Sequence, residues 1–452
     1  MQTAPCIVPF NGHSTPPLRK NSRLRPTVAI VGGGAGGCCC AIELGLTGRF
    51  NILLLEKNQQ LMRETSDMTP ARLGLGFHYA DKATALHFLH VAVEFVKRYG
   101  QFRQEIGRKE CHPPRRGRYF IMKNSLVPLK DILDVYDAIK KEYAKRVRED
   151  PSCEVFGPSE NIYRILEPHE FEEHVERGNV EMGIETAEEL LDWSRLRKYI
   201  IERIEKQKKS GVSVLTFTEV EVITAREEGG YIIEGMNTFH GSAVRISTDL
   251  VINASWYNIS KFNQSLGISS ACRKRCNRIK AIATVQLPKE LANLPSMFFC
   301  MGPFCMFSNK GNGVGMMTYA PETNLAVTSS SCELEPQFSQ IYHCLSENEK
   351  CAKGQRILAG VSKFIPQMRN AKLTKVSIGI VQTFMDEDTV DHGFKIGNLD
   401  FIHDPLKGGI AKRNCSGVEE PLPGYIINSC MKLIFCFENA ELIKDIITTR
   451  YR

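Results

Sequence analysis

The sequence predicts an α/β protein in which a Rossmann-like, doubly wound parallel sheet is joined to a second α+β domain with a mixed or antiparallel sheet. Three stretches lead to this prediction. A strand, a glycine turn, a helix and a second strand follow one another near the N-terminus, a helix and several strands follow in the middle, and a strand, a turn and a helix end the chain. Helices that alternate with buried strands are typical of a continuing parallel sheet.

The N-terminal stretch carries a dinucleotide-binding pattern. The β-branched run Val28–Val31 leads into Gly32, Gly34 and Gly37 in the G-x-G-x-x-G spacing, and the next apolar run ends at Glu56. Gly32 permits a tight turn, Gly34 lets a pyrophosphate approach the backbone, and Gly37 lets the helix pack close to the sheet. The helix N-terminus offers N–H groups to phosphate, and the Glu56 carboxylate can accept hydrogen bonds from a ribose. By itself this pattern suits either FAD or NAD.

The middle and C-terminal stretches predict more of the same sheet. Leu196, Ile200 and Ile204 share one face of a helix that Gly211 ends, and strands follow as far as the buried segment "DLVINASW". The C-terminal segment "GYIINSCMKLIFCFENAELIKDII" has the pattern of a strand, a turn and a helix. These patterns indicate that the chain leaves the first domain and returns to it.

The domain organisation follows from this order. We expect a flexible basic tail at residues 1–25, a discontinuous nucleotide-binding domain made of residues 26–85, 185–260 and 375–452, and a substrate or cap domain made of residues 86–184 and 261–374.

Composition narrows the class of protein. The 452 residues carry a mild net charge of +7 and no arginine-rich stripe with interleaved aromatic residues, so nothing in the sequence supports nucleic-acid binding. No apolar run reaches the ~20 residues that a membrane-spanning helix needs, and we expect no integral membrane segment. The basic tail shares its acid-free composition with mitochondrial transit peptides, but its prolines would break an amphipathic helix. We therefore expect a cytoplasmic protein.

The sixteen cysteines do not have the spacing of a metal site. No C-x-x-C pair occurs, and the consecutive Cys38, Cys39 and Cys40 would point ~100° apart on a helix. The sequence therefore predicts no bound metal and no structural disulfide, and it indicates a reducing compartment.

In this order, these segments resemble the flavin-dependent oxidoreductases of the D-amino-acid oxidase and glycine oxidase superfamily. Four places carry the resemblance: "VAIVGGGAGG…LLLEK", "TEVEVI", "TDLVINASW" and "GYIINSCMKL". The resemblance implies FAD rather than NAD, bound in a domain of the GR2 type. It also implies a small-molecule substrate.

The same resemblance assigns the cofactor contacts. The third and fourth places depart from the family pattern. Ser255 and Trp256 stand where Ala-Gly or Gly-x-Trp is expected, and Asn428–Lys432 contains no glycine where the family generally has glycines. The predicted cofactor-binding residues are Gly32, Gly33, Gly34, Ala35, Gly36, Gly37, Glu56, Lys57, Val220, Ala254, Ser255, Cys430, Met431 and Lys432. The resemblance also makes Cys305 and Cys430 candidates for covalent attachment of the flavin, because some relatives attach it through a cysteine.

The segment "ARLGLGFHY" is similar to stretches that lie beside the flavin in this superfamily, and it supplies the predicted catalytic residues. Arg72 would pair with a phosphate or with a substrate carboxylate. His78 would act as a base or stabilise the charge of the reduced flavin, and Tyr79 would hydrogen-bond to the substrate. The competing interpretation is that His78 and Tyr79 are satisfied polar residues of the core.

Three functions follow as hypotheses. The first is hydride transfer from a small anionic amine or amino acid to flavin N5. The second is dehydrogenation of a hydroxy acid or polyol phosphate, and the third is flavin binding without turnover, which the missing glycines keep open. The electron acceptor stays open between oxygen and another acceptor.

Overall fold

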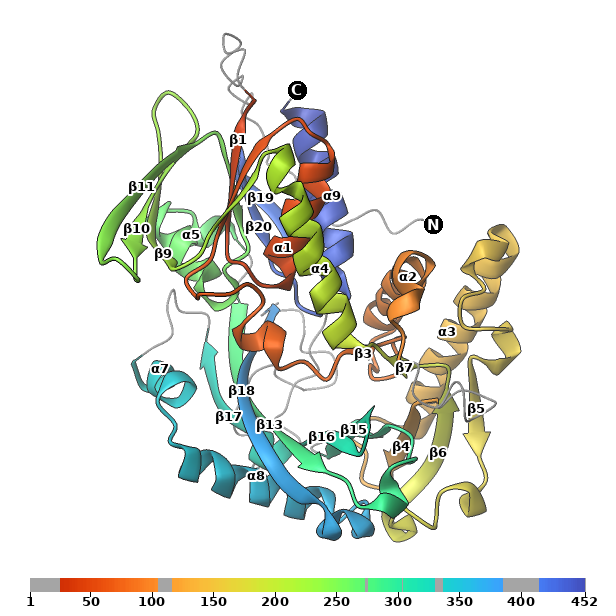
Figure 1. Ribbon diagram of the computed structural model, residues 1–452. Coiled ribbons are helices and arrows are strands. Elements are labelled where there is room, and N and C mark those ends of the chain that lie inside the picture. The colour runs from red at the N-terminus through yellow and green to blue at the C-terminus, as the bar shows by residue number, and fades with distance from the viewer. Residues whose placement is uncertain are drawn as a thin grey trace.

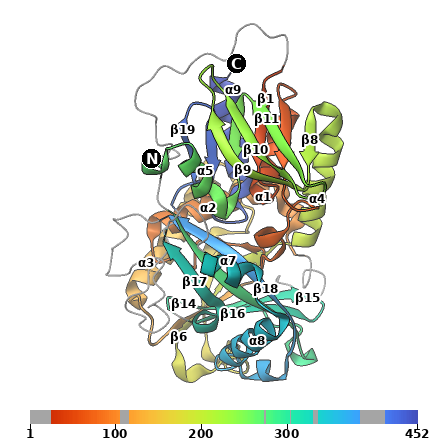
Figure 2. The ribbon, with the colours of Figure 1, turned by 90° about the vertical axis from the view of Figure 1, so that its left-hand side faces the viewer.

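The computed structural model describes residues 25–104, 116–272, 275–302, 304–329, 336–384 and 414–451. Two parts, each built around a sheet, lie one above the other, and helices pack beside each sheet (Figures 1 and 2). The predicted basic tail at residues 1–25 lies outside the described residues except for Arg25.

The first sheet has six strands in the order β19-β20-β12-β1-β2-β8. Their bounds are β1 (Thr27–Val31), β2 (Asn51–Leu55), β8 (Val212–Leu215), β12 (Leu250–Asn253), β19 (Val418–Leu422) and β20 (Tyr425–Asn428). All neighbours are parallel except β19 and β20. Strands from three distant parts of the chain therefore share one doubly wound sheet, and the predicted fold class is confirmed.

Each face of this sheet packs against a different layer, because successive side chains of a strand point to opposite faces. Val28 and Ile30 of β1 lie in the core that includes helices α1 (Ala35–Leu46), α4 (Trp193–Gln207) and α9 (Phe435–Arg450). Ala29 and Val31 face the opposite core instead. That core is formed with the antiparallel strands β9 (Thr218–Ala225), β10 (Tyr231–Asn237) and β11 (Ser242–Thr248) and with helix α5 (Ile259–Ser265).

The second sheet has nine strands and is mixed, as predicted. β14 and β4 are parallel, whereas the other recorded pairs are antiparallel. The strands are β4 (Arg118–Met122), β5 (Tyr163–Leu166), β6 (Val180–Thr186), β13 (Arg275–Gln286), β14 (Met297–Cys300), β15 (Cys305–Gly311), β16 (Val314–Tyr319), β17 (Asn324–Ser329) and β18 (Lys372–Phe384).

The helices of this second layer lie mainly on its outer side and at one end. They are α2 (Lys82–Tyr99), α3 (Leu129–Glu149), α6 (Ala320–Thr323), α7 (Pro336–His343) and α8 (Glu347–Val361), and α8 runs along the lower edge in Figure 1. Ile279 and Ala281 of β13 pack in the same core as Ile357 of α8, so the alternate residues Lys280 and Ile282 face the other way. A short ribbon, β3 (Arg72–Leu73) with β7 (Glu189–Leu190), stands beside this layer.

Two predicted domain boundaries fall inside elements of the structure. Residue 85 lies within helix α2, which begins at Lys82 because the Asp81 carboxylate accepts the N–H of Thr84 at 2.8 Å. Strand β18 pairs with β13 along its length, so residues 375–384 lie in the second sheet rather than in the first. The sequence assigned them to the first because a lone apolar strand does not reveal its partner.

Helices α2 and α9 meet through three titratable side chains. The Nε2 atoms of His87 and His90 lie 3.7 and 3.9 Å from the Glu438 carboxylate. Burial raises the pKa of Glu438 from 4.5 to about 7 and lowers the pKa of His87 to about 4. The folded state therefore holds a proton on Glu438 at pH values where the unfolded chain has released it.

Replacing Glu438 by Gln should consequently make the free energy of unfolding less dependent on pH. The contribution of Glu438 to stability is fully present below its unfolded pKa of 4.5 and is lost as the pH rises towards its folded pKa of about 7. The melting temperature of Glu438→Gln minus that of the parent protein should become more positive as the pH rises from 5 to 8. Glu173→Gln, at a carboxylate that is 83% exposed, serves as the matched control and should show no such trend.

Candidate cofactor and substrate site

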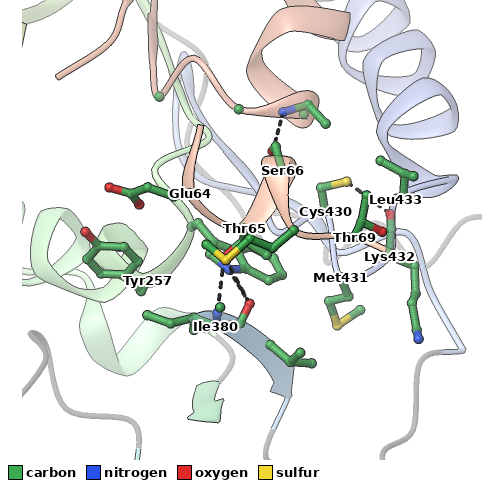
Figure 3. Close-up of a pocket in the computed structure, with 18 of the residues that line it drawn as sticks. Glu64, Thr65, Ser66, Thr69, Tyr257, Ile380, Cys430, Met431, Lys432 and Leu433 are labelled. Atoms are coloured by element: carbon green, nitrogen blue, oxygen red, sulfur yellow. Dashed lines mark hydrogen bonds between the residues drawn. The ribbon is translucent and has the colours of Figure 1, made fainter. Parts of the chain in front are cut away.

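One cavity of about 380 Å³ lies between the two sheets. Its wall includes the end of β1, the N-terminus of α1, residues 63–70 after β2, the inner face of the second sheet and the segment after β20 (Figure 3). Of the predicted cofactor-binding residues, the wall contains Gly32, Gly34, Ala35, Gly36, Glu56, Lys57, Val220, Ala254, Ser255, Cys430, Met431 and Lys432. The three predicted catalytic residues, Arg72, His78 and Tyr79, also line it.

The glycine turn forms the narrowest part of this wall. Gly32 has a φ of +108°, and a Cβ there would lie 2.5 Å from the carbonyl oxygen of Ala254, so only glycine fits. Gly34 precedes helix α1, and a Cβ there would meet only the Ser66 Oγ, at 3.3 Å. The space beside Gly34 is open, as close approach of a phosphate to the backbone requires.

Gly33 and Gly37 lie behind the wall rather than on it. A Cβ on Gly37 would stand 1.9 Å from the carbonyl oxygen of Gly32, so this glycine serves the contact between helix and turn. Gly33 donates its N–H to Glu56 Oε2 at 2.9 Å. Both positions shape the turn without facing the cavity.

Glu56 is held in place at the end of β2. Its side chain is almost fully buried, and its Oε1 accepts the backbone N–H and the side-chain amide of Asn58 at 2.8 and 2.7 Å. Burial raises the pKa of Glu56, while the hydrogen bonds from Asn58 and Gly33 lower it in part. A carboxylate has about four acceptor sites, so these three bonds leave it able to accept a ribose hydroxyl.

Lys57 lines the cavity, but its ammonium group has partners within the protein. Its Nζ lies 2.7 Å from Glu64 Oε1 and 2.6 Å from the Tyr257 hydroxyl, and Figure 3 shows Glu64 beside Tyr257. Burial alone would lower the pKa of Lys57, but Tyr257 and Glu64 raise it above its ordinary value. Lys57 therefore ties the loop after β2 to the segment after β12.

Residues 62–70 of this loop, which precede the predicted segment at 71–79, were not predicted to contribute to the site. Ser66 Oγ accepts the N–H of Ala35 at 3.1 Å, so a serine hydroxyl occupies the first donor of helix α1 (Figure 3). Thr65 Oγ1 accepts the N–H of Ile380 in β18 at 3.2 Å. Met62 and Glu64 have positive φ values of 59° and 56°. The signal in the sequence was a pair of small hydroxyl residues after the second strand of a dinucleotide-binding unit.

Trp256 forms a second link between the two sheets. It follows β12 with a φ of 61°, a left-handed conformation that is uncommon for a large side chain, and its indole N–H donates to the Ile380 carbonyl at 2.9 Å. Gln382 of β18 donates in return to the Trp256 carbonyl at 3.2 Å. Trp256 thus anchors β18 to the segment after β12.

The segment after β20 closes the cavity near the glycine turn. A Cβ on Gly36 would lie 3.2 Å from the Cβ of Cys430, which shows how closely this segment passes the first turn of α1. Cys430 lines the cavity, whereas Cys305 is buried in β15 and does not. Of the two cysteines considered for flavin attachment, only Cys430 reaches the cavity.

The Arg72 guanidinium is hydrogen-bonded to side chains of the protein itself. Its Nε and Nη2 donate to Glu188 Oε1 at 3.1 and 2.5 Å, and Nη2 also donates to the Tyr119 hydroxyl. Its guanidinium stacks on the Phe298 ring at 3.2 Å, and Nη1 lies 3.9 Å from Met306 Sδ. The two-pronged face that would bind a substrate carboxylate already holds a carboxylate of the protein.

The other predicted catalytic residues differ in exposure. His78 is exposed at the cavity, whereas Tyr79 is buried with its ring 4.6 Å from that of Phe88. The inner face of the second sheet adds Lys280 and Thr318, which the sequence did not single out. Besides Arg72, the cationic side chains on the cavity wall therefore include Lys280 and Lys432.

Within the residues that the structure describes, no group of His, Cys, Asp and Glu side chains could hold a metal ion, and the cysteines whose state is described are free. No helix in that part of the chain is long and apolar enough to cross a membrane. The predicted cytoplasmic location stays a prediction.

Comparisons with known proteins agree with this geometry. Residues 27–400 match the profile of a family described as FAD dependent oxidoreductase. Glycine oxidase from Geobacillus kaustophilus has a similar structure, with a TM-score of 0.58, 13% identity, and coverage of 94% of this chain and 95% of that one. L-amino acid deaminase from Proteus vulgaris has a TM-score of 0.59 and 16% identity, with coverage of 98% of this chain and 96% of that one. L-alpha-glycerophosphate oxidase from Mycoplasma pneumoniae, with FAD bound, has a TM-score of 0.57 and 15% identity, with coverage of 95% of this chain and 96% of that one. No curated protein sequence matches significantly. At these identities the structural likeness shows the fold.

The pair of Arg72 and Glu188 predicts a characteristic pattern of stability. Arg72→Met would leave the Glu188 side chain, which is 3% exposed, charged without its cation, at a cost of about 3–5 kcal/mol. The double variant Arg72→Met/Glu188→Gln removes that charge and should recover much of the loss. Chemical denaturation of the parent, both single variants and the double variant measures the coupling. Equal losses in Arg72→Met and in the double variant would show that charge pairing is unimportant here.

Proposed function

The chain belongs to the FAD-dependent oxidoreductase family, and on that premise we propose that it oxidises a small anionic amine or amino acid by hydride transfer to the flavin. FAD, when bound, accepts the hydride and supplies the redox chemistry. The protein has to bind the substrate, orient its reacting C–H bond and accept its proton.

The described residues fit FAD. The cavity wall includes Glu56 at the end of β2, which keeps about one free acceptor site, and the open space beside Gly34 at the N-terminus of α1. It continues between the Cys430 segment and the second sheet to His78. A ribose, a pyrophosphate and a ring system follow one another in the same order along an extended dinucleotide.

The charge at the far end of the cavity supports an anionic substrate. Glu188 is the carboxylate at that end, and its charge is matched by Arg72. Lys280 and Lys432 also line the cavity. The presence of these two lysine side chains on the wall is the observation that carries the proposal, and we assign the anion-binding role to them rather than to Arg72.

The reaction also needs a proton acceptor, and His78 suits this role. An ammonium group must lose a proton before its neighbouring C–H bond can be oxidised to an imine, and imidazole is a common general base near neutral pH. His78 is exposed at the cavity, whereas the buried Tyr79 packs against Phe88. We therefore assign proton removal to His78 and shaping of the cavity to Tyr79.

A polyol phosphate or a hydroxy acid is the alternative substrate. The similar structures include a glycerophosphate oxidase as well as glycine oxidase and amino acid deaminases. Lysine ammonium groups bind phosphate as well as carboxylate, so Lys280 and Lys432 suit either anion.

Flavin bleaching without oxygen distinguishes these substrates. The purified protein should show flavin absorption near ~450 nm. Small amino acids should bleach it, and the corresponding amides, which lack the carboxylate, should not. Bleaching by glycerol phosphate or hydroxy acids alone would favour the alternative, and no bleaching by any of these compounds would contradict catalysis of this type.

Gly34→Val should give a folded protein without flavin. The introduced Cβ meets no backbone atom, so the fold should persist, but the valine methyl groups would fill the space that the pyrophosphate needs. Flavin absorbance per chain and circular dichroism test this expectation together. Gly178→Val, at an exposed turn, is the matched control and should keep its flavin. A full complement of flavin in Gly34→Val would refute the assignment of the pyrophosphate site.

Lys280→Met should impair the use of anionic substrates specifically. Loss of a cation that contacts a substrate anion should lower kcat/KM by a factor equivalent to about 2–5 kcal/mol of transition-state stabilisation, while flavin content stays unchanged. Lys198→Met, at a side chain that is 78% exposed on α4, is the matched control. An unchanged kcat/KM in Lys280→Met would exclude this lysine from substrate binding.

A further inference from the structure

Three side chains on neighbouring strands of the second sheet form a row on the cavity wall. The strands stand in the order β13, β16 and β15. Thr318 of β16 pairs directly with Met306 of β15. The pairing of Ala283 with Met317 continues the ladder to β13, so Ile282 is the neighbour of Thr318 on the other side. Ile282, Thr318 and Met306, which we call the cross-strand row, all line the cavity.

The cross-strand row lies on the cavity side of the sheet because successive side chains of a strand point to opposite faces. Ala283, Met317 and Phe307, which follow or precede the members of the row, are buried in the core that the sheet shares with α8. The members of the row are only partly buried. The row therefore presents an isoleucine, a threonine and a methionine side chain to whatever the cavity holds.

Lys280 stands beside the cross-strand row. It precedes Ile282 by two residues on β13, so the two side chains share a face and lie ~7 Å apart along the strand. Gly379 of β18 is directly opposite Lys280, and a Cβ on Gly379 would meet no atom closer than 3.9 Å. The absent side chain leaves room next to Lys280 for the substrate carboxylate that we assign to it.

We propose that the cross-strand row binds the side chain of the substrate, and that this substrate is an amino acid with an apolar aliphatic or thioether side chain. The inference rests on the proposed function, because Lys280 has to hold the carboxylate for the side chain to lie on the row. Removal of methylene groups from water onto such a surface is favourable, so a longer apolar side chain is bound more tightly. Met306 can adjust to side chains of different shape because its thioether is unbranched and flexible.

A charged substrate side chain does not suit the cross-strand row. Arg72 lies next to the row, with its Nη1 at 3.9 Å from Met306 Sδ, but it is ion-paired with Glu188. A carboxylate or ammonium group placed on the row would exchange water for two apolar side chains and one hydroxyl, which is unfavourable.

Anaerobic reduction of the flavin by a homologous series of amino acids tests this assignment. Glycine and both enantiomers of alanine, norvaline and norleucine form the series, and the second-order rate constant of flavin reduction should rise about fourfold with each added methylene group. Lysine is norleucine with a terminal ammonium group, and it should reduce the flavin at least about tenfold more slowly than norleucine. Equal rate constants across the series, or equal rate constants for lysine and norleucine, would overturn the inference and leave amino-acid oxidation intact. Failure of every amino acid to reduce the flavin would overturn it together with the proposed function.

Ile282→Ser should weaken the dependence on side-chain length. The ratio of the rate constants for norleucine and alanine should fall about tenfold, because the variant removes apolar surface that the longer side chain contacts. This ratio is independent of the fraction of flavin-loaded protein. Ile165→Ser, at a side chain of β5 that is 52% exposed, is the matched control and should keep the parental ratio. An unchanged ratio in Ile282→Ser would overturn the assignment of the row.

Titration with butyrate and hexanoate provides a readout without turnover. These carboxylates lack the amino group and cannot be oxidised to an imine. Hexanoate should perturb the flavin spectrum of the parent protein at a concentration roughly tenfold lower than butyrate, because it has two more methylene groups. Equal affinity for the two compounds would contradict an apolar side-chain site. The parent protein suffices for this titration and for the amino-acid series, so both remain decisive if Ile282→Ser fails to fold.

Discussion

The contact between helix α1 and the glycine turn is the constraint on which the rest of the structure depends. Gly37 allows the helix to approach the Gly32 carbonyl, and a Cβ at this position would stand 1.9 Å from that oxygen. This close approach places the helix N-terminus directly beyond the ends of the parallel strands. The preceding residue, Gly36, lets the Cys430 segment pass close to the helix, because a Cβ there would lie 3.2 Å from the Cβ of Cys430. Without side chains at these positions, the ends of three chain segments can surround one cavity.

The second sheet completes that cavity through polar contacts, beside an apolar core to which both sheets contribute. Thr65 and Trp256 both bond to the backbone of Ile380, so β18 is held from two sides by the first layer. The ion pair between Arg72 and Glu188 links the two strands of the short ribbon, β3 and β7, that lies beside the second layer. These contacts leave Lys280 on the wall of the cavity.

The sequence predicted those parts of the site that local patterns encode. The glycine turn and Glu56 lie in one strand–helix–strand unit, whose spacing specifies its geometry. The partner of Arg72 was not predictable in this way, because Glu188 is 116 residues away and pairs through a two-stranded ribbon. Lys280 escaped notice for the same reason, since only the pairing of β13 with β18 shows which of its faces meets the cavity. Ser66 carried a usable signal, a hydroxyl residue just after the second strand.

The central claim is that this cavity binds a complete dinucleotide through the glycine turn. The most direct measurement is titration of the flavin-free protein with FAD, FMN and riboflavin, followed by the fluorescence of its two tryptophans. Trp256 lines the cavity, and Trp193 donates to the backbone of Ser66 on its wall, so both report binding. The account predicts saturable quenching by FAD at one molecule per chain and much weaker binding of FMN and riboflavin, which lack the adenosine half. Equal affinity for FAD and FMN, or no quenching by FAD, would contradict it.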